Sequence, residues 1–488
     1  MPAGRVMEGV RMALGRRDDE RQDPMWIATD KLVQAPGHPF YARLNQLLAE
    51  AGFDRFVEER CRKFYAEGVG RPGIAPGVYF RMLFIGYFEG IDSERGIAWR
   101  CADSLGLRDF LGYDLAHATP NHSTLSVIRR RIDLETHQEV FDFVLKMLDQ
   151  RGLIKGQTIG CDATTLEANA ALRSIVRRDT GETYRAFLER LAKESGIQTP
   201  TREDLARLDR ARQGKGNNDD WMNPNDPEAK IMKMKDGRTH LTHKAEHAVD
   251  MDTGATLAVT VQPADRGDCE SIGHTLSETM ENLATLSEGR AEPRQIREVV
   301  TDKGYHSNDV VTALEEMGIR TYVSEPKRRR RNWKGKQREK QAVYANRRRI
   351  RSERGKRLLR KRGELLERPF AHHYDTGGMR RTHLRTHAKI LKRLLVHSGA
   401  CNLGLLMRTL FGVGKPRALQ GGATALAAAL VGALWLLVRL VTAPASPGRA
   451  LARGPFIPAP RPRRSTGAPP CSESWLLQRA ASPRRHGP

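Results

Sequence analysis

The stretch Thr158–Ser174, TIGCDATTLEANAALRS, places a single carboxylate at the end of a short apolar run. Asp162 closes that run, and small polar residues and alanines follow it. A surface turn or a helix N-cap is one interpretation of such a residue. The other is a metal ligand at the end of a buried strand, where several carboxylates converge. Other parts of the chain distinguish the two.

A second carboxylate stands in the same setting in IREVVTDKGYHS (residues 296–307). There a β-branched run ends in Asp302, and a glycine-containing turn and a helix follow. Adjacent strand ends would bring Asp162 and Asp302 together, and two like charges in one site require a neutralising cation. Oxygen ligands alone favour Mg²⁺ or Mn²⁺. A third acid would complete a two-ion site, and the candidates are Glu364 and Glu367, one helical turn apart.

The charge of the chain points to a polyanionic partner. The 488 residues carry a formal net charge of +24, which favours nucleic acid over an anionic membrane surface. Nineteen basic residues against two acidic ones lie in the basic segment 327–362. A solvated face is the alternative, but the segment lies inside a patterned region, so we interpret it as a phosphate-contacting surface. The six cysteines are scattered without a C-x-x-C pair, which fits a reducing cytoplasm.

Periodicity divides the chain into a helical part and a mixed part. Residues 1–150 are predicted to be all-α, with Ser93 and Ser123 as helix N-caps. Two short helices followed by a basic one resemble a helix-turn-helix; a helical bundle with a charged outer face is the alternative. Three strands, then alternating helix and strand, predict a mixed α/β sheet within residues 151–410. The polar stretch at about 173–235 is predicted to be an insertion.

The C-terminal part, residues 411–488, contains an uncharged, alanine-rich stretch of 18 residues, Gly421–Val438. This length is just enough to span a bilayer. Because the stretch follows a basic region and ends at Arg439, we interpret it as a helix packed on the protein or a partner, and we expect no membrane association. From Pro444 onward the chain is rich in Pro and Arg and is predicted to be disordered.

Four separated motifs carry a resemblance to a known family. They are DATTLEANAALRSIVRRDTGE (162–182), KMKDGRTHLTHKAEHAVD (233–250), TDKGYHS (301–307) and RGKRLLRKRGELLERPFAHHYDTGGMRRTHLR (354–385). In this order they resemble the DDE transposases of bacterial insertion sequences, and more narrowly the insertion-sequence five-type superfamily. The similarity extends from about residue 70 to about residue 410.

The resemblance implies an RNase H-like catalytic fold that is interrupted by an insertion and preceded by a helical DNA-binding region. It implies that Asp162, Asp302 and Glu367 are the catalytic acids and hold two Mg²⁺ (or Mn²⁺) ions, with Glu364 as the fallback for the third. The implied activity is cleavage and strand transfer of double-stranded DNA at the terminal inverted repeats of the element. A homodimer on the DNA, in the cytoplasm with the nucleoid, is expected because two element ends must be paired. The alternative is a catalytically inactive relic that binds DNA as a repressor.

Basic residues near these motifs are expected to hold the DNA backbone, although each alone also fits an ordinary surface charge. They are Arg129, Arg130, Arg131, Lys244, Lys303, Arg347, Arg348, Arg349 and Arg362.

Overall fold

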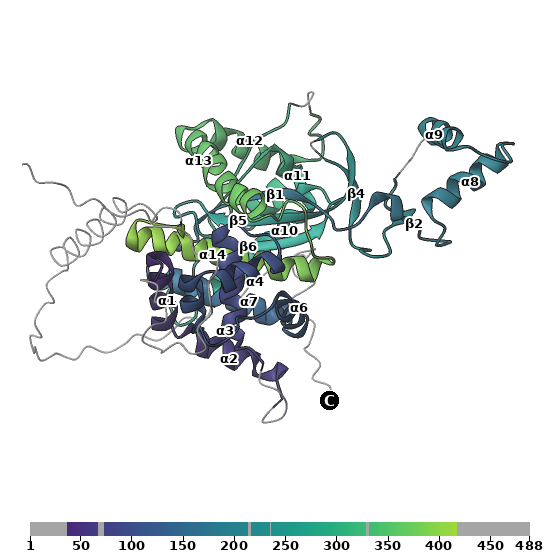
Figure 1. The fold of residues 1–488 in the computed structure, drawn as a ribbon. Coiled ribbons are helices and arrows are strands. Elements are labelled where there is room, and N and C mark those ends of the chain that lie inside the picture. Colours follow the sequence, from purple (N-terminus) through teal and green to yellow (C-terminus); the bar gives the residue numbers. More distant parts are fainter. Residues whose placement is uncertain (1–36, 67–72, 213–215, 235, 328–330, 417–488) are drawn as a thin grey trace, which may run out of the picture.

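The computed structural model describes residues 37–66, 73–212, 216–234, 236–327 and 331–416. Its N-terminal part consists of helices (Figure 1), which are α1 (Pro39–Glu50), α2 (Phe53–Cys61), η2 (Arg62–Phe64), α3 (Pro76–Glu89), α4 (Glu94–Asp103), α5 (Leu105–Leu111), α6 (His122–Arg131) and α7 (Leu134–Gln150). Ser93 caps α4 as predicted, since its hydroxyl accepts from the backbone N–H of Gly96. The predicted cap at Ser123 is wrong: Asn121 caps α6, and its side chain accepts from the N–H of Ser123.

A mixed sheet follows, as the strand patterns predict. Its strands are β1 (Thr158–Glu167), β4 (Lys230–Lys233), β5 (Thr239–Asp250), β6 (Thr256–Pro263), β7 (Glu298–Thr301) and β8 (Arg320–Val323). The order is β4-β5-β1-β7-β8, and β6 pairs with β5. Strand β1 is antiparallel to β5 but parallel to β7, and β7 is parallel to β8. A mixed sheet with flanking helices confirms the predicted α/β class and is consistent with the RNase H-like fold that the resemblance implies.

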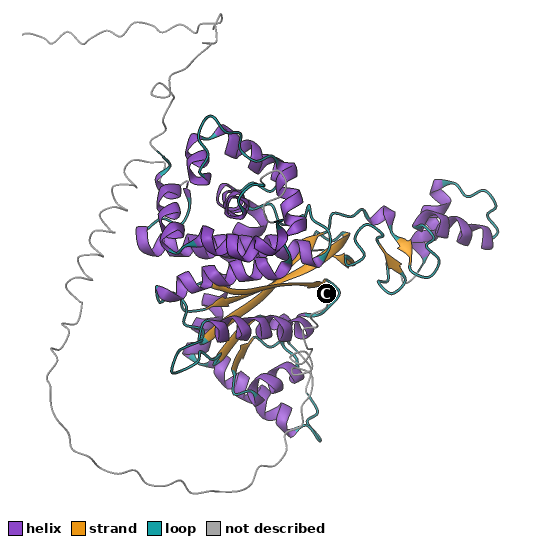
Figure 2. Ribbon diagram, turned by 90° about the horizontal axis from the view of Figure 1, so that it is seen from below, coloured by secondary structure: helices purple, strands orange, loops and turns teal. Residues whose placement is uncertain are grey.

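Helices cover both faces of this sheet (Figure 2). They are α10 (Asp268–Thr285), α11 (Asn308–Glu316), α12 (Gln337–Arg351), α13 (Glu353–Phe370) and α14 (His387–Phe411), with the short turns η4 (Lys303–Tyr305) and η5 (Ala371–Thr376). Helix α13 packs on β1, β7 and β8, whereas α10 packs on β5 and β6 and α14 on β6. The basic segment therefore contributes the helix pair α12–α13, one member of which lies against the central strands.

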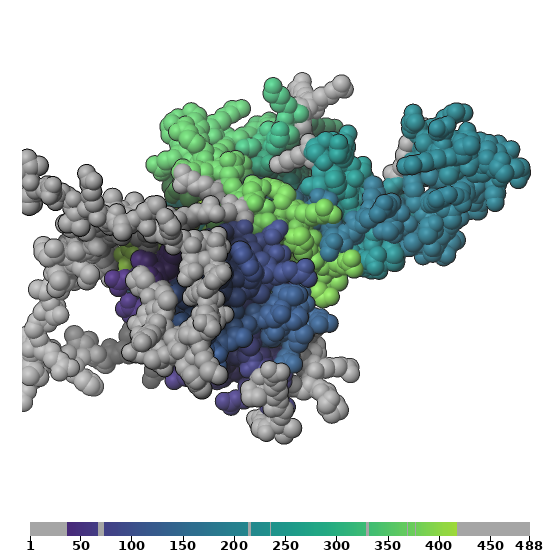
Figure 3. Space-filling view, viewed as in Figure 1, coloured from purple at the N-terminus to yellow at the C-terminus, as the bar shows by residue number. Residues whose placement is uncertain are grey.

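The stretch predicted to be an insertion folds into a small module of its own. It contains η3 (Leu172–Ser174), β2 (Val176–Arg177), α8 (Tyr184–Glu194), α9 (Arg202–Ala211) and β3 (Trp221–Met222). Trp221 is 1% exposed and anchors a separate hydrophobic cluster with Phe187 and Leu188. Helices α8 and α9 project away from the sheet (Figures 1 and 3). The polar sequence reflects the large exposed surface that such a projecting module has.

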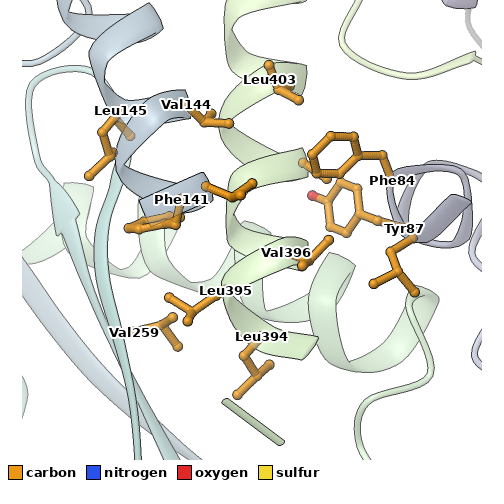
Figure 4. Close-up of a cluster of buried hydrophobic side chains, with 14 of the residues drawn as sticks. Phe84, Tyr87, Phe141, Val144, Leu145, Val259, Leu394, Leu395, Val396 and Leu403 are labelled. Atoms are coloured by element: carbon orange, nitrogen blue, oxygen red, sulfur yellow. The ribbon is translucent and has the colours of Figure 1, made fainter. Parts of the chain in front are cut away.

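Helix α14 joins the N-terminal helices to the sheet. Its apolar side chains meet Phe141 and Val144 of α7, Phe84 of α3 and Val259 of β6 (Figure 4). One buried cluster thus extends from α1 to α14, across the predicted boundary at residue 150. Within the described residues α14 is the one helix long and apolar enough to cross a membrane, but most of it is buried in this core. The stretch Gly421–Val438 and the tail lie outside the described residues.

Candidate active site

Asp162 lies on the face of β1 that is covered by α13. Successive side chains of a strand point to opposite faces, so Ile159 and Cys161 enter the main core while Gly160 and Asp162 face α13. A Cβ atom on Gly160 would lie 2.5 Å from the Met251 sulfur and 3.2 Å from Leu366 of α13. A larger residue here would require the Met251 and Leu366 side chains to shift, so glycine favours the close approach of α13 to the strand. That approach places the helix beside the Asp162 carboxyl.

Asp302 reaches the same edge of the sheet from β7. In the parallel register Gly160 lies opposite Val300, so the next residues facing the same way are Asp162 and Asp302. The Asp302 carboxylate accepts a 2.8 Å hydrogen bond from the backbone N–H of Gly304 and so caps the turn η4. The pKa of Asp162 is raised by burial, and the charge of Asp302 raises it further. The two carboxyls predicted to converge are therefore neighbours.

A cation from α13 already lies at this pair. Arg362 donates to Oδ2 of Asp162 at 3.0 Å, and both side chains are largely buried. The guanidinium lowers the pKa of Asp162, but burial outweighs it and the pKa remains above its usual value. Arg362 thus acts as the counter-ion that a pair of like charges requires.

Both candidates for the third acid, Glu367 and Glu364, are exposed side chains of α13, and they point in different directions. Arg354 of α13 binds Glu298 at the start of β7, so that edge of the helix faces the strand starts. Gly363 follows Arg354 by nine residues, about two and a half helical turns. It therefore lies on the edge of α13 opposite to Arg354, and this edge faces the strand ends. The Glu367 carboxylate lies along this edge, 3.6 Å from the position a Cβ of Gly363 would take.

Glu364 lies two residues from both Arg362 and Leu366, which contact the sheet, and is exposed. Residues two apart do not share a helix face, so Glu364 is turned away from the strand ends. Among the residues that the structure describes, no three His, Cys, Asp or Glu side chains are grouped closely enough to hold a metal ion. The oxygen-only pair of Asp162 and Asp302 nevertheless fits a hard divalent cation in its chemistry. A third ligand on α13 stays a prediction from the family resemblance.

Five of the nine basic residues expected to contact DNA are bound to carboxylates in the structure, and one of them is Arg362, which binds Asp162. Arg129 pairs with Glu94. Lys244 is buried and lies 2.6 Å from Asp268, and Arg347 and Arg349 form bidentate pairs with Glu325 and Glu315. These pairs do not test contact with DNA, so the expected DNA contacts stay a prediction. The carboxylate partners lie far away in the chain and could not be read from the local sequence. The exposed members of the set are Arg130, Arg131, Lys303 and Arg348.

One group of side chains near the site was not predicted from the sequence. Glu246 of β5 is fully buried opposite Ala163, the residue after Asp162, and is surrounded by hydroxyl groups. The only signal was a charged residue in the middle of a strand pattern, in THLTHKAEHAVD. That signal does not reveal which residues bind it.

Two family models match the chain. Residues 28–131 match the Transposase domain (DUF772), and residues 197–403 match the Transposase DDE domain. Together these matches cover more than half of the 488 residues. They support a DDE-type transposase.

In this transposase, Asp302 and Glu367 fall inside the DDE match, whereas Asp162 precedes its start. Helix α6, which carries the three predicted DNA-contacting arginines, ends with the first match. No curated protein and no solved structure matches the chain.

Asp302→Asn is expected to lower the pKa of Asp162, because it removes the neighbouring negative charge that raises it. Arg362→Gln is expected to shift the same pKa upward. Burial holds this pKa above its unfolded value, so ionising Asp162 costs stability as the pH rises through the folded-state pKa. Carboxyl ¹³C NMR titration of the metal-free protein measures these shifts.

Asp309→Asn, at an exposed position of α11, is the control and should leave Asp162 unaffected. An Asp162 titration that does not respond to Asp302→Asn would show that the two carboxyls do not share a site.

Proposed function

We propose that this chain cuts the terminal inverted repeats of its own element and joins the ends to target DNA, as a member of the insertion-sequence five-type superfamily. The observation that carries the proposal is the pairing of Asp162 with Asp302 at adjacent strand ends, in a chain that matches a transposase DDE domain. Two acids on a rigid sheet, with a third on the helix that crosses it, suit phosphodiester chemistry.

Asp162, Asp302 and Glu367 would hold two Mg²⁺ or Mn²⁺ ions. Such ions activate the attacking oxygen and stabilise the leaving oxygen of the phosphodiester. The protein's own part is to fix the carboxylates: the N–H of Ala163 donates to Asp162 at 2.9 Å, and that of Gly304 donates to Asp302 at 2.8 Å. Arg362 would leave Asp162 for a DNA phosphate when the ions bind, because a guanidinium suits both partners.

Double-stranded DNA would be held by the exposed cations of α6 and α12 and by Lys303, which is adjacent to Asp302 in the sequence. Pairing two element ends requires two active sites, so we propose that the chain acts as a homodimer on DNA. Its place of action would be the nucleoid in the cytoplasm.

A second candidate function is a DNA-binding repressor without nuclease activity. The observation in its favour is that the described side chains form no three-ligand cluster, while Arg362 occupies Asp162. The two candidates differ in whether the protein cuts DNA when Mg²⁺ is supplied, and they agree on binding.

Glu367→Gln is expected to reduce Mg²⁺-dependent cleavage of element-end DNA by about 100-fold or more, because a metal ligand contributes several kcal/mol to the transition state. Glu364→Gln, on the outer face of the same helix, is the matched control and should cut nearly as fast as the wild type. Gel-based cleavage, with binding followed in parallel, gives both values. The reverse ranking would make Glu364 the third acid, and wild-type binding without cutting would establish the repressor.

Arg348→Gln is expected to reduce the slope of log K against log salt for DNA binding by about 0.9, the value for one lost phosphate contact. Arg347→Gln, next to it on α12, should leave the slope unchanged, since Arg347 is bound to Glu325 at 2.6 and 2.8 Å. Fluorescence anisotropy at several salt concentrations measures both slopes. Equal slopes for Arg348→Gln and the wild type would exclude this face of α12 from the DNA interface.

A further inference from the structure

Glu246 is a buried carboxylate beneath the candidate active site. It has no exposed surface, and it lies on β5 opposite Ala163. Three hydroxyl groups donate to it: Ser271 at 2.8 Å, Tyr305 at 2.7 Å and Thr275. Each donor is itself fully buried.

A buried carboxylate is costly unless it is hydrogen-bonded, and hydrogen bonds to a charged acceptor are roughly twice as strong as neutral ones. Lys244 extends the network, because its ammonium donates to Ser271 at 2.8 Å and lies 2.6 Å from Asp268. Burial raises the pKa of Glu246, whereas the three hydroxyls and Lys244 lower it. A buried hydrogen-bond network fixes the positions of its side chains when every polar group has a partner.

The network is connected to Asp302 through Tyr305 and the turn η4. Tyr305 is the last residue of η4, the turn that Asp302 caps through the N–H of Gly304. The hydroxyl of Tyr305 fixes the far end of that turn to Glu246, and the Cys269 thiol donates to the carbonyl of Gly304 at 3.3 Å.

Helix α10 also closes on this turn at Gly304. A Cβ on Gly304 would lie 2.3 Å from the Asp268 carboxylate, so the turn and the start of α10 are in close contact. Strand β5 and helix α10 thus hold η4 from two sides, and the N–H of Gly304 in this turn orients the Asp302 carboxylate.

We propose that Glu246 is a positioning residue that, through Tyr305 and η4, fixes the Asp302 carboxylate for divalent-ion binding. This inference rests on the proposed function, because it assigns Asp302 as a metal ligand. Substituting a residue that orients a metal ligand without touching the ion commonly weakens metal binding by 10- to 100-fold. A role confined to joining α10 to the sheet would change stability and leave ion affinity as it is.

The test compares Tyr305→Phe with Tyr41→Phe. Tyr41 is a matched control, since it is also a buried tyrosine and donates to a carboxylate, Glu89, at 2.8 Å, but within the N-terminal helices. Binding of Mn²⁺ to the full chain is measured by electron paramagnetic resonance, and Mg²⁺-dependent cleavage of element-end DNA is measured beside it. Tyr305→Phe is expected to weaken Mn²⁺ binding by about 10-fold and to raise the half-saturating Mg²⁺ concentration similarly.

Tyr41→Phe should change neither quantity, and DNA affinity should be the same in all proteins. Glu246→Gln, which keeps the side-chain shape, is the second variant and should weaken Mn²⁺ binding at least as much as Tyr305→Phe. If Tyr305→Phe and Glu246→Gln bind Mn²⁺ like the wild type, the positioning role is excluded, whatever their stability. If the wild type binds Mn²⁺ but does not cut, the nuclease proposal fails, while the Mn²⁺ series still decides the role of Glu246. A wild type that binds no Mn²⁺ overturns both.

Discussion

Parallel pairing of β1 with β7 is the constraint on which the candidate site depends. It brings Asp162 and Asp302 to one edge of the sheet although 140 residues separate them in the chain. Burial raises the pKa of Asp162, and the neighbouring charge of Asp302 raises it further. The glycine at position 160 lets α13 approach, and α13 supplies Arg362 as the counter-ion. A polyanionic backbone and divalent ions are the partners that would replace this internal ion pair.

The strands and the two aspartates could be predicted from the sequence because their signal is local. Apolar runs that end in an acid and a turn mark strand ends, and alternation reveals which residues share a face. The third acid could not be assigned from the sequence, because two glutamates lie one helical turn apart. Their directions depend on how α13 packs on the sheet. Long-range pairs were beyond reach: Lys244 is bound by Asp268, and Arg129 by Glu94, at sequence separations that no periodicity records. The core role of Trp221 was missed for a related reason, since the residues around it are polar and charged.

The arrangement of α14 has a consequence for how the two parts of the molecule act. Because this helix packs on α3 and α7 as well as on β6, the N-terminal helices and the mixed sheet share one buried core. A DNA end held by the N-terminal helices would thus be fixed in position relative to Asp162 and Asp302. By contrast, α8 and α9 project from the sheet, and a second hydrophobic cluster joins Phe187 and Trp221 of this module to Ile231 of β4 and Leu241 of β5.

Under the proposed function, three segments far apart in the sequence hold divalent ions at one place. Affinity cleavage tests it most directly: Fe²⁺ replaces Mg²⁺, peroxide is added, and the sites of backbone scission are mapped by mass spectrometry. We expect scission beside residues 162, 302 and 367 together, suppressed by excess Mg²⁺. Scission confined to other segments, or at the two strand ends without any on α13, would contradict it.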